Sequence, residues 1–527
     1  MTDDVTVYKS IAQTLVDHRV ETVFGLMGDA NLFMVDHYVN QLGGKFVPVA
    51  HEASSVLMAM GFAHVADTVG VATVTHGPAL TNCITALVEG VRASVPLLLL
   101  AGDTPPGNPK HLQNIDQREL IKTTGAGFEQ MRSAQTASED VARAYYRAQN
   151  EQRPVVLNMP VDLMWEAAPA PTTPKLDVFT APRGAAHSDV MDEAVGMIAS
   201  ARRPLILAGR GASQAKDQLV ALADRLEAPL ATTLKGKNLF VDHPYNIGFF
   251  GTLSSPAAYE VMAQADCIIC FGTSFNYHTT DHGKLMTDKR IVQVDIDPAA
   301  IGNTPHPNAA IVADAGSAAE AFLYWLNEAE IAPSGFTKEL DPEVLTHYPS
   351  LPNKTPEGYI NYVQALDALE EALPKDRIVV TDVGRFMLEA WVRISAPDPR
   401  SFIAATTFAS VGLGLQEAIG AGFAAPGRTI VAICGDGGFM MGALNEFHTA
   451  VREGMDCIVI VANDRAYGAE HVQFAFRGMD PTQSHLNWPD FASIATAMGG
   501  QGYKVDSDAA LAKAIDGIKG RKGAILI

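Results

Sequence analysis

The sequence has no apolar run long enough to cross a membrane, and its N-terminus lacks the basic stretch that precedes the apolar segment of a signal peptide. Basic residues are also scarce, because 39 Lys and Arg stand against 59 Asp and Glu, for a net charge of −20. This balance disfavours nucleic acids and anionic membranes as partners, since binding either requires a basic surface. We therefore expect a soluble, cytoplasmic protein that acts on small molecules.

Cysteine is rare as well, with only five residues: Cys83, Cys267, Cys270, Cys434 and Cys457. Most of them fall in expected strands or at helix starts, where buried thiols are common. Cys267 and Cys270 have C-x-x-C spacing, but they lie inside one apolar run and no second pair follows. The sequence therefore predicts neither a zinc site nor redox chemistry for them.

A chain of 527 residues is too long for one hydrophobic core, and the usual domain size predicts three domains. Short apolar runs alternate with helical stretches, a pattern that indicates parallel α/β layers. Segments rich in proline, at 167–174 and 332–355, divide the chain. We predict three doubly wound parallel-sheet α/β domains, at 1–168, 188–330 and 356–527. The expected strands are 22–25, 46–50, 70–75, 96–101, 154–159, 204–208, 230–233, 267–272, 291–295, 378–381, 401–403, 429–434 and 457–462, and the chain ends within a further expected strand.

A glycine-rich turn, Gly435-Asp436-Gly437-Gly438, follows the β-branched run 429–434. Asp436 should therefore stand at the carboxyl end of a buried parallel strand, where open α/β sheets bind ligands. The glycines let backbone N–H groups approach an anion, and a helix expected to begin near Phe439 would direct its positive end toward it. Because a carboxylate at this point can hold a cation, we predict that metal and phosphate bind here together.

A second strand, 457–462, ends at Asn463 and Asp464, about 27 residues after Asp436. Amide and carboxylate oxygens are ligands that Mg²⁺ prefers when it bridges a diphosphate. Either motif alone is also typical of an ordinary turn, but their pairing after two apolar strands favours a binding site. The residue types alone leave open whether Asn463 or Asp464 holds the metal.

This pairing resembles the diphosphate motif of thiamine diphosphate enzymes in the 2-oxoacid decarboxylase and acetolactate synthase family, where GDG is followed by a pair that is usually Asn-Asn. The resemblance implies Mg²⁺ ligation by Asp436, Asp464 and the Ala466 carbonyl, and cofactor contacts from Gly435, Gly437 and Gly438. The departure is Asp464, a carboxylate in place of an amide. The resemblance also implies three domains in the order pyrimidine-binding, central and diphosphate-binding.

The segment His51-Glu52, after the expected strand 46–50, resembles the family's other cofactor motif. Glu52 matches the carboxylate that hydrogen-bonds the aminopyrimidine ring nitrogen, and an acid there favours the imino form that can remove the thiazolium C2 proton. A glutamate at a helix start is also favoured by the helix dipole alone.

Two carboxylates stand at positions where the pyruvate and indolepyruvate decarboxylases carry acidic residues. Asp29, in Gly25-Leu26-Met27-Gly28-Asp29, resembles an aspartate used there in proton transfer, and Glu470 lies at the offset of a second acid. Two carboxylates that converge on one carbon can move protons in turn. The alternatives are that Asp29 caps the next helix and that Glu470 is a solvated loop residue.

Two histidines, His76 and His278, stand where benzoylformate decarboxylase carries its catalytic histidines. The adjacent histidine pair of pyruvate decarboxylases is missing, and its region begins at His111-Leu112. The pocket is thus a mixture, and the sequence does not name the 2-oxoacid.

The remaining cofactor contacts follow by position in the family. Gly384 and Arg385 end an expected strand and can reach the diphosphate. Val411 matches the apolar residue that bends the cofactor, although it also suits ordinary core packing. The Ala409 carbonyl matches the acceptor for the exocyclic amine.

The resemblance implies a thiamine diphosphate- and Mg²⁺-dependent carbon–carbon lyase that decarboxylates a 2-oxoacid through a C2-enamine. The alternative is a carboligase like acetolactate synthase, which joins the acyl carbanion to a second carbonyl. FAD is not expected, because Gly272-Thr273-Ser274-Phe275-Asn276 replaces the Arg-rich flavin segment of those synthases. A protein of a different class, a nucleotide-binding regulator, is indicated only by the segment Gly209-Arg210-Gly211-Ala212, which weakly resembles a Rossmann turn. The family further implies a homodimer or homotetramer with shared active sites.

Overall fold

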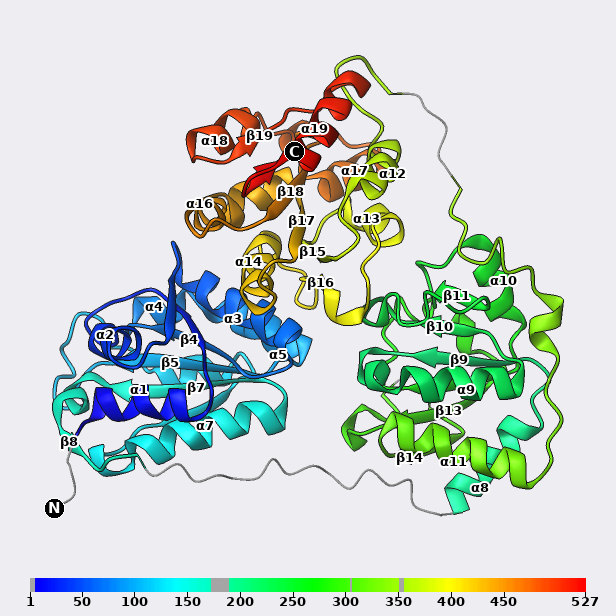
Figure 1. The fold of residues 1–527 in the computed structure, drawn as a ribbon, viewed down its shortest axis with the longest axis horizontal. Helices are drawn as coiled ribbons and strands as arrows, with labels where there is room; N and C mark the ends of the chain where they lie inside the picture. The colour runs from blue at the N-terminus through cyan, green and yellow to red at the C-terminus, as the bar shows by residue number, and fades with distance from the viewer. Residues whose placement is uncertain (1–4, 172–188, 304–305, 350–354) are drawn as a thin grey trace. The chain divides into compact units, whose positions relative to one another are not determined.

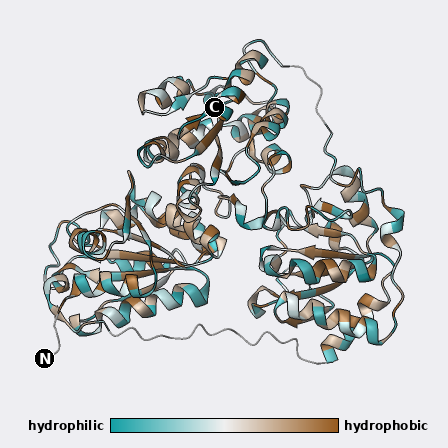
Figure 2. Cartoon of the chain, in the orientation of Figure 1, coloured by the Kyte–Doolittle hydropathy of each residue, from teal (hydrophilic) through white to brown (hydrophobic). Residues whose placement is uncertain are grey.

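The structure, a computed structural model, describes residues 5–171, 189–303, 306–349 and 355–527 (Figure 1). Three six-stranded parallel sheets carry the fold, and helices cover both faces of each, so the predicted fold class is confirmed. Apolar residues concentrate in the strands and in the helix faces turned toward them (Figure 2). In the described ranges no helix combines the length and apolar character needed to cross a membrane.

The N-terminal sheet, coloured blue to cyan in Figure 1, has the order β3-β2-β4-β5-β7-β6. Leu97 and Leu99 pack on one face with α3 and α5, whereas Leu98 and Leu100 pack on the other with α1, α2 and α7. A strand buried on both faces is therefore apolar at every position. The bounds are β2 Thr22–Gly25, β3 Lys45–Pro48, β4 Gly70–Val74, β5 Leu97–Asp103, β6 Gly127–Gln130, β7 Pro154–Pro160, α1 Val7–Asp17, α2 Leu32–Asn40, α3 Glu52–Ala66, α5 Ile84–Ala93 and α7 Ala137–Glu151.

The central sheet has the order β11-β10-β9-β12-β13-β14. Cys267 and Cys270 are fully buried in separate clusters on opposite faces of β12, which agrees with the prediction that they form no ligand pair. Burial raises the pKa of Cys267 to about 12. The bounds are β9 Pro204–Ala208, β10 Leu230–Thr232, β11 Asn246–Phe249, β12 Cys267–Phe271, β13 Arg290–Asp295, β14 Ala309–Val312, α8 Asp189–Ala199, α9 Lys216–Leu226, α10 Pro256–Gln264 and α11 Ala315–Glu328.

The two expected linkers have different outcomes. Part of the first, 172–174, lies outside the described residues, and its start forms β8 Ala167–Ala168, which pairs with β1 Val5–Thr6. The second expected linker, 332–355, is not a linker over 336–345, because Phe336 and Leu345 are buried in the central domain. Proline content there reflects a packed irregular segment, and the three domain boundaries stay predictions.

The C-terminal sheet, yellow to red in Figure 1, has the order β16-β15-β17-β18-β20-β19. Its two central strands, β17 and β18, end at the motifs that the sequence singled out. The bounds are β15 Arg377–Thr381, β16 Phe402–Ala404, β17 Thr429–Gly435, β18 Cys457–Ala462, β19 Gln501–Gly502, β20 Ile525–Leu526, α12 Tyr362–Ala372, α13 Met387–Arg393, α14 Gly414–Ala424, α16 Leu444–Arg452, α17 Gly468–Phe476, α18 Phe491–Ala497 and α19 Asp508–Gly520.

The N- and C-terminal sheets belong to one compact unit (1–176, 354–390 and 403–527), and the central sheet to another (177–353 and 391–402). Within the first unit, α3 packs against α14 in antiparallel fashion. A Cβ on Gly61 would lie 1.9 Å from the Glu417 carbonyl oxygen, and one on Gly420 would lie 1.8 Å from the Met58 carbonyl oxygen. Only glycine permits this approach, and one hydrophobic core runs through both domains.

Candidate cofactor site

The glycine turn lies at the carboxyl edge of the C-terminal sheet, as predicted. The helix begins at Asp436 rather than near Phe439, so that expectation is wrong; a π-helical turn, Phe439–Ala443, then leads into α16. Gly437 and Gly438 can join the helix because they lack side chains. A Cβ on Gly437 would lie 2.7 Å from the Tyr467 ring, and one on Gly438 would lie 2.4 Å from Asp382 Oδ2.

Asp436 is nearly inaccessible, with 3% of its surface exposed. The indole Nε1 of Trp488 donates to its Oδ2 at 3.1 Å, and the Gly437 backbone N–H donates to its Oδ1 at 2.9 Å. Burial and the negative charge of Asp464 raise the pKa of Asp436 to about 6. Two carboxylates held together in this way are stabilised by a cation, so the donor set fits Mg²⁺.

The turn after β18 orders both predicted metal-ligand candidates. Asp464 Oδ1 accepts from the Ala466 N–H at 3.1 Å, and Asn463 Oδ1 accepts from the Arg465 N–H at 3.1 Å. The negative charge of Asp464 contributes to the raised pKa of Asp436, so these two carboxylates interact, and the choice between Asp464 and Asn463 as the metal ligand stays a prediction. No group of three His, Cys, Asp or Glu suited to a metal occurs among the described residues. The predicted site has two carboxylates and the Ala466 carbonyl, so it does not require a group of three such side chains.

A loop between β16 and α14 brings Val411 and Ala409 toward the glycine turn. Val411 Cγ1 would lie 2.9 Å from a Cβ on Gly438, and Ala409 is exposed in a left-handed conformation with φ +61°. Asp382, buried at the end of β15, accepts from the Gly412 N–H at 2.9 Å and the Leu413 N–H at 3.2 Å. Burial raises the pKa of Asp382 to about 6.

Arg385 and Gly384 follow Asp382 on the same edge. Arg385 is exposed, and its Cδ would lie 3.6 Å from a Cβ on Gly468, in the first turn of α17. The structure thus gathers most of the predicted cofactor residues at one edge of one sheet. They are Gly384, Arg385, Val411, Gly435, Asp436, Gly437, Gly438 and Asp464.

Glu52 lies at the carboxyl edge of the N-terminal sheet, as the first residue of α3. Asn82 Nδ2 donates to Glu52 Oε2 at 2.9 Å, and the His51 imidazole caps the helix by accepting from the Ala53 N–H at 3.2 Å. Just before the helix, the Ala50 N–H donates to Glu446 Oε1 of α16 at 3.0 Å. The turn that presents Glu52 is therefore fixed from both domains.

Asp29 and His76 meet on the same edge. His76 is buried with 1% exposure, and neither of its ring nitrogens makes a hydrogen bond within the described residues. Asp29 Oδ1 accepts from the Thr75 hydroxyl at 3.1 Å and lies 3.4 Å from His76 Nε2. The capping alternative for Asp29 is wrong, because α2 begins at Leu32 without a side-chain cap.

The other two predicted catalytic residues are placed separately. Glu470 is exposed on the first turn of α17, so it belongs to a helix rather than a loop. His278 is exposed in the turn after β12, in the central domain, where its N–H donates to Asn276 Oδ1 at 3.0 Å. Three contributors were missed from the sequence: Asp382, Trp488 and Asn82.

Glu52 and the diphosphate edge lie far apart within one chain. Met58 faces Gly420, and six residues, or about 9 Å of helix, separate Met58 from Glu52. Another six residues, again about 9 Å, separate Gly420 from Gly414, whose Cβ would touch Asp382. Because the helices are antiparallel, Glu52 lies about 18 Å along their axes from Gly414, which borders the diphosphate edge at Asp382.

These two edges, with a glycine turn beside two carboxylates at one sheet and a glutamate at another, fit the class of α/β enzymes that bind a cofactor at the carboxyl ends of parallel strands. Models of the thiamine pyrophosphate enzymes match the chain in three segments: the N-terminal TPP binding domain at 5–120, the central domain at 191–322 and the C-terminal TPP binding domain at 382–527. The chain belongs to the thiamine pyrophosphate enzyme family.

Similar proteins of this family carry several activities in their names. A sulfoacetaldehyde acetyltransferase of Castellaniella defragrans is 30% identical over 97% of this chain and 91% of its own length. A probable 2-ketoarginine decarboxylase of Pseudomonas aeruginosa is 30% identical, over 94% and 88%. An acetolactate synthase of Mycobacterium bovis is 27% identical, over 95% and 84%. The prediction of a thiamine diphosphate-dependent enzyme is thereby confirmed.

Proposed function

We propose that the protein is a Mg²⁺-dependent lyase that decarboxylates a 2-oxoacid with thiamine diphosphate. The observation that carries this proposal is the contact between Asp29 and His76, a proton-transferring pair at the edge that also holds Glu52. Decarboxylation replaces a carboxylate by a proton, so it requires groups that deliver one.

Each end of the cofactor has a set of residues suited to it. Asp436, Asp464 and the Ala466 carbonyl would hold Mg²⁺, while the glycine turn and Arg385 would hold the diphosphate. When bound, thiamine diphosphate supplies the electron sink for the electron pair that is left as CO₂ departs. Glu52 would hold a proton at the aminopyrimidine ring nitrogen, and its hydrogen bond from Asn82 orients the carboxylate.

The predicted acids and histidines would transfer protons to and from the substrate. His76 would donate to or accept from the reacting carbon or its oxygen, with Asp29 holding the imidazole through the 3.4 Å contact. Glu470 and His278 stay predicted participants. We propose no flavin, since the segment 272–276 does not match the Arg-rich flavin segment expected from the resemblance to acetolactate synthases.

The separation of about 18 Å along the helix axes between Glu52 and Gly414 supports active sites shared between chains. Within one chain, the residues suited to the diphosphate and the residue suited to the aminopyrimidine ring lie at opposite ends of this helix pair. A second copy would supply Glu52 to the diphosphate edge of the first, and the reverse. The proposed active unit is a homodimer, with a homotetramer as a pair of such dimers.

A carboligase is the second candidate. It is favoured by the name of one relative, an acetolactate synthase that is 27% identical to this chain. In this reaction a second carbonyl compound, instead of a proton, captures the acyl group. The same residues would bind the cofactor, and the proton-transferring pair would act on the acceptor oxygen.

Product analysis separates these functions. The protein is loaded with thiamine diphosphate and Mg²⁺ and incubated with aliphatic and aromatic 2-oxoacids, 2-ketoarginine and sulfoacetaldehyde, while CO₂, aldehydes and ketols are followed. CO₂ with one equivalent of aldehyde supports the lyase. CO₂ with ketol supports the carboligase, and product from sulfoacetaldehyde without CO₂ contradicts the lyase.

A further inference from the structure

A buried carboxylate of the N-terminal domain holds the cofactor loop of the C-terminal domain. Glu89 lies on α5 and is 1% exposed. Its Oε1 accepts from the Thr407 N–H at 2.9 Å, and its Oε2 accepts from the Phe408 N–H at 2.6 Å. The Thr407 hydroxyl also donates to Oε1. One side chain therefore binds two successive backbone amides, 318 and 319 residues away in sequence.

These bonds fix the backbone immediately before Ala409. Ala409 has φ +61°, a conformation that a non-glycine residue keeps only where its surroundings impose it. The Arg92 guanidinium, one turn after Glu89 on α5, lies 4.6 Å from the centre of the Phe408 ring. Asp382 binds the other end of the loop at Gly412 and Leu413. Two buried carboxylates, from two domains, thus hold 407–413 between them.

We propose that Glu89 is a positioning residue for the aminopyrimidine–thiazolium part of thiamine diphosphate. It sets the loop so that the Ala409 carbonyl and Val411 face the ring system. This inference rests on the proposed function, because it requires that the loop contact the cofactor. The rings, and not the diphosphate, are the part that depends on Glu89.

The ring system and the diphosphate of thiamine diphosphate would bind to different residues, so the role of Glu89 can be tested on each part separately. The residues suited to Mg²⁺ and diphosphate are Asp436, Asp464 and the glycine turn, and none of the hydrogen bonds of Glu89 reaches them. Loss of the Glu89 carboxylate should therefore weaken binding of the whole cofactor and leave binding of inorganic diphosphate with Mg²⁺ unchanged. A general loss of folding would weaken both.

The experiment compares Glu89→Gln with wild type in the full-length chain. Glutamine keeps the size of the side chain but presents an N–H₂ group to one of the two backbone donors. Calorimetry with thiamine diphosphate and, separately, with inorganic diphosphate, both with Mg²⁺, gives two dissociation constants. We expect the first to rise at least tenfold and the second to stay within twofold of wild type.

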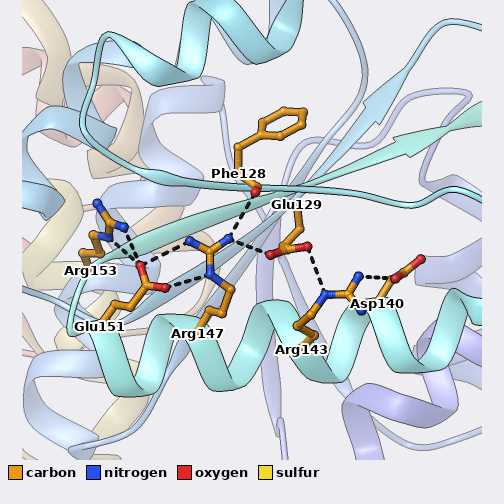
Figure 3. Close-up of polar contacts among 7 residues, drawn as sticks. All are labelled: Phe128, Glu129, Asp140, Arg143, Arg147, Glu151 and Arg153. Atoms are coloured by element: carbon orange, nitrogen blue, oxygen red, sulfur yellow. Dashed lines mark hydrogen bonds and ion pairs between the residues drawn. The ribbon is translucent and has the colours of Figure 1, made fainter.

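Glu129→Gln is the matched control. Glu129 is in the same domain and accepts from Arg143 Nε at 3.0 Å and from Arg147 at 2.6 Å, in a network with Glu151 and Arg153 that excludes the cofactor loop (Figure 3). This variant loses charge-assisted bonds that support β6 and α7. We expect a lower melting temperature with both dissociation constants unchanged.

Glu89→Asp keeps the charge and serves if the glutamine variant does not fold. Its shorter side chain should still weaken cofactor binding selectively. Parallel loss of both ligands, or wild-type affinity for thiamine diphosphate in the folded variant, would overturn the assignment of Glu89. Wild-type protein that binds neither ligand would instead refute the proposed function, so the two failures are distinguishable.

Discussion

Nε2 of His76 lies 3.4 Å from Oδ1 of Asp29, although the imidazole is buried and 71% of the aspartate side chain is exposed. The carboxylate is open to solvent, whereas neither ring nitrogen of the imidazole has a hydrogen-bond partner among the described residues. The pair therefore places a solvent-accessible acid next to a buried imidazole, and the proposed proton transfer rests on this arrangement.

Asp29→Asn and His76→Ala should each lower kcat/KM for a 2-oxoacid by about 10²–10⁴-fold, the range typical of a lost acid–base group. Because the two act as one unit, the double variant should be little worse than either single variant. Steady-state kinetics of all four proteins measures the coupling. Fully multiplicative losses would show that the residues act independently.

Glu52→Gln should preserve folding and most cofactor affinity while turnover falls by about two orders of magnitude or more. The amide can still accept the hydrogen bond from Asn82 Nδ2, but it cannot hold an acidic proton at the ring nitrogen. Calorimetry and product formation are measured on the same preparation. Turnover at the wild-type rate would remove Glu52 from its assigned role.

Asp436→Asn should remove most of the pH dependence of the stability of the metal-free protein, because the amide does not titrate. Its N–H₂ group faces one of the two hydrogen-bond donors of Asp436, Trp488 Nε1 or the Gly437 N–H, which offsets much of the gain from removing a buried charge. Since the pKa of Asp436 is raised to about 6, the folded protein binds a proton that the unfolded chain releases between about pH 4 and 6. Stability of the metal-free wild type therefore increases as the pH falls from about 7 to 5.

Urea unfolding at pH 7.5 and pH 5, without metal, checks this prediction. In Asp436→Asn the increase in stability from pH 7.5 to pH 5 should shrink to the part owed to other groups, among them Asp382 and Asp295, whose pKa values burial also raises. Asp516→Asn, on the exposed face of α19, serves as the control and should change neither value. The same Asp436 variant should no longer retain thiamine diphosphate in the presence of Mg²⁺.

Asp464→Ala should weaken Mg²⁺-dependent binding of thiamine diphosphate by at least tenfold, and more than Asn463→Ala does. The reason is that Asp464 places its charge next to Asp436, whereas the Asn463 oxygen accepts from the Arg465 N–H within its own turn. Cofactor titrations at several Mg²⁺ concentrations rank the two variants. The opposite ranking would transfer the ligand role to Asn463.

Mixing inactive Glu52→Gln with inactive Asp436→Ala protein should restore activity, because a mixed dimer has one site in which both residues are intact. With random reassembly, half of the dimers are mixed and each has one intact site out of two, so about a quarter of wild-type activity is expected under the shared-site arrangement. The proteins are mixed at low salt after brief dissociation and assayed with time. Full wild-type activity in a strictly monomeric species by sedimentation would contradict shared sites.

The strands were predictable wherever they are buried on both faces. Pro204–Ala208 and Cys457–Ala462 have the expected bounds, since a parallel strand between two helix layers is apolar throughout. Gly127–Gln130 and Gln501–Gly502 were missed because they are short edge strands with polar residues. Edge strands carry little of the alternating or continuous apolar signal.

The site was predictable only in its local motifs. Asp436, Asp464 and Glu52 each follow an apolar strand, so their placement at a sheet edge could be inferred. Glu89 bonds with residues more than 300 positions away, and no spacing rule links such partners. The available signal is a glutamate within the otherwise apolar stretch 86–91 of α5.

The glycine contacts between α3 and α14 affect how sequences of this kind can diverge. The two cofactor-bearing domains share one core although the central domain separates them by nearly two hundred positions in sequence. Substitutions in the central sheet leave that shared core untouched, whereas any residue larger than glycine at 61 or 420 forces the helices apart. Inherited variation should therefore accumulate away from this contact, while the α3–α14 seam stays nearly invariant among descendants.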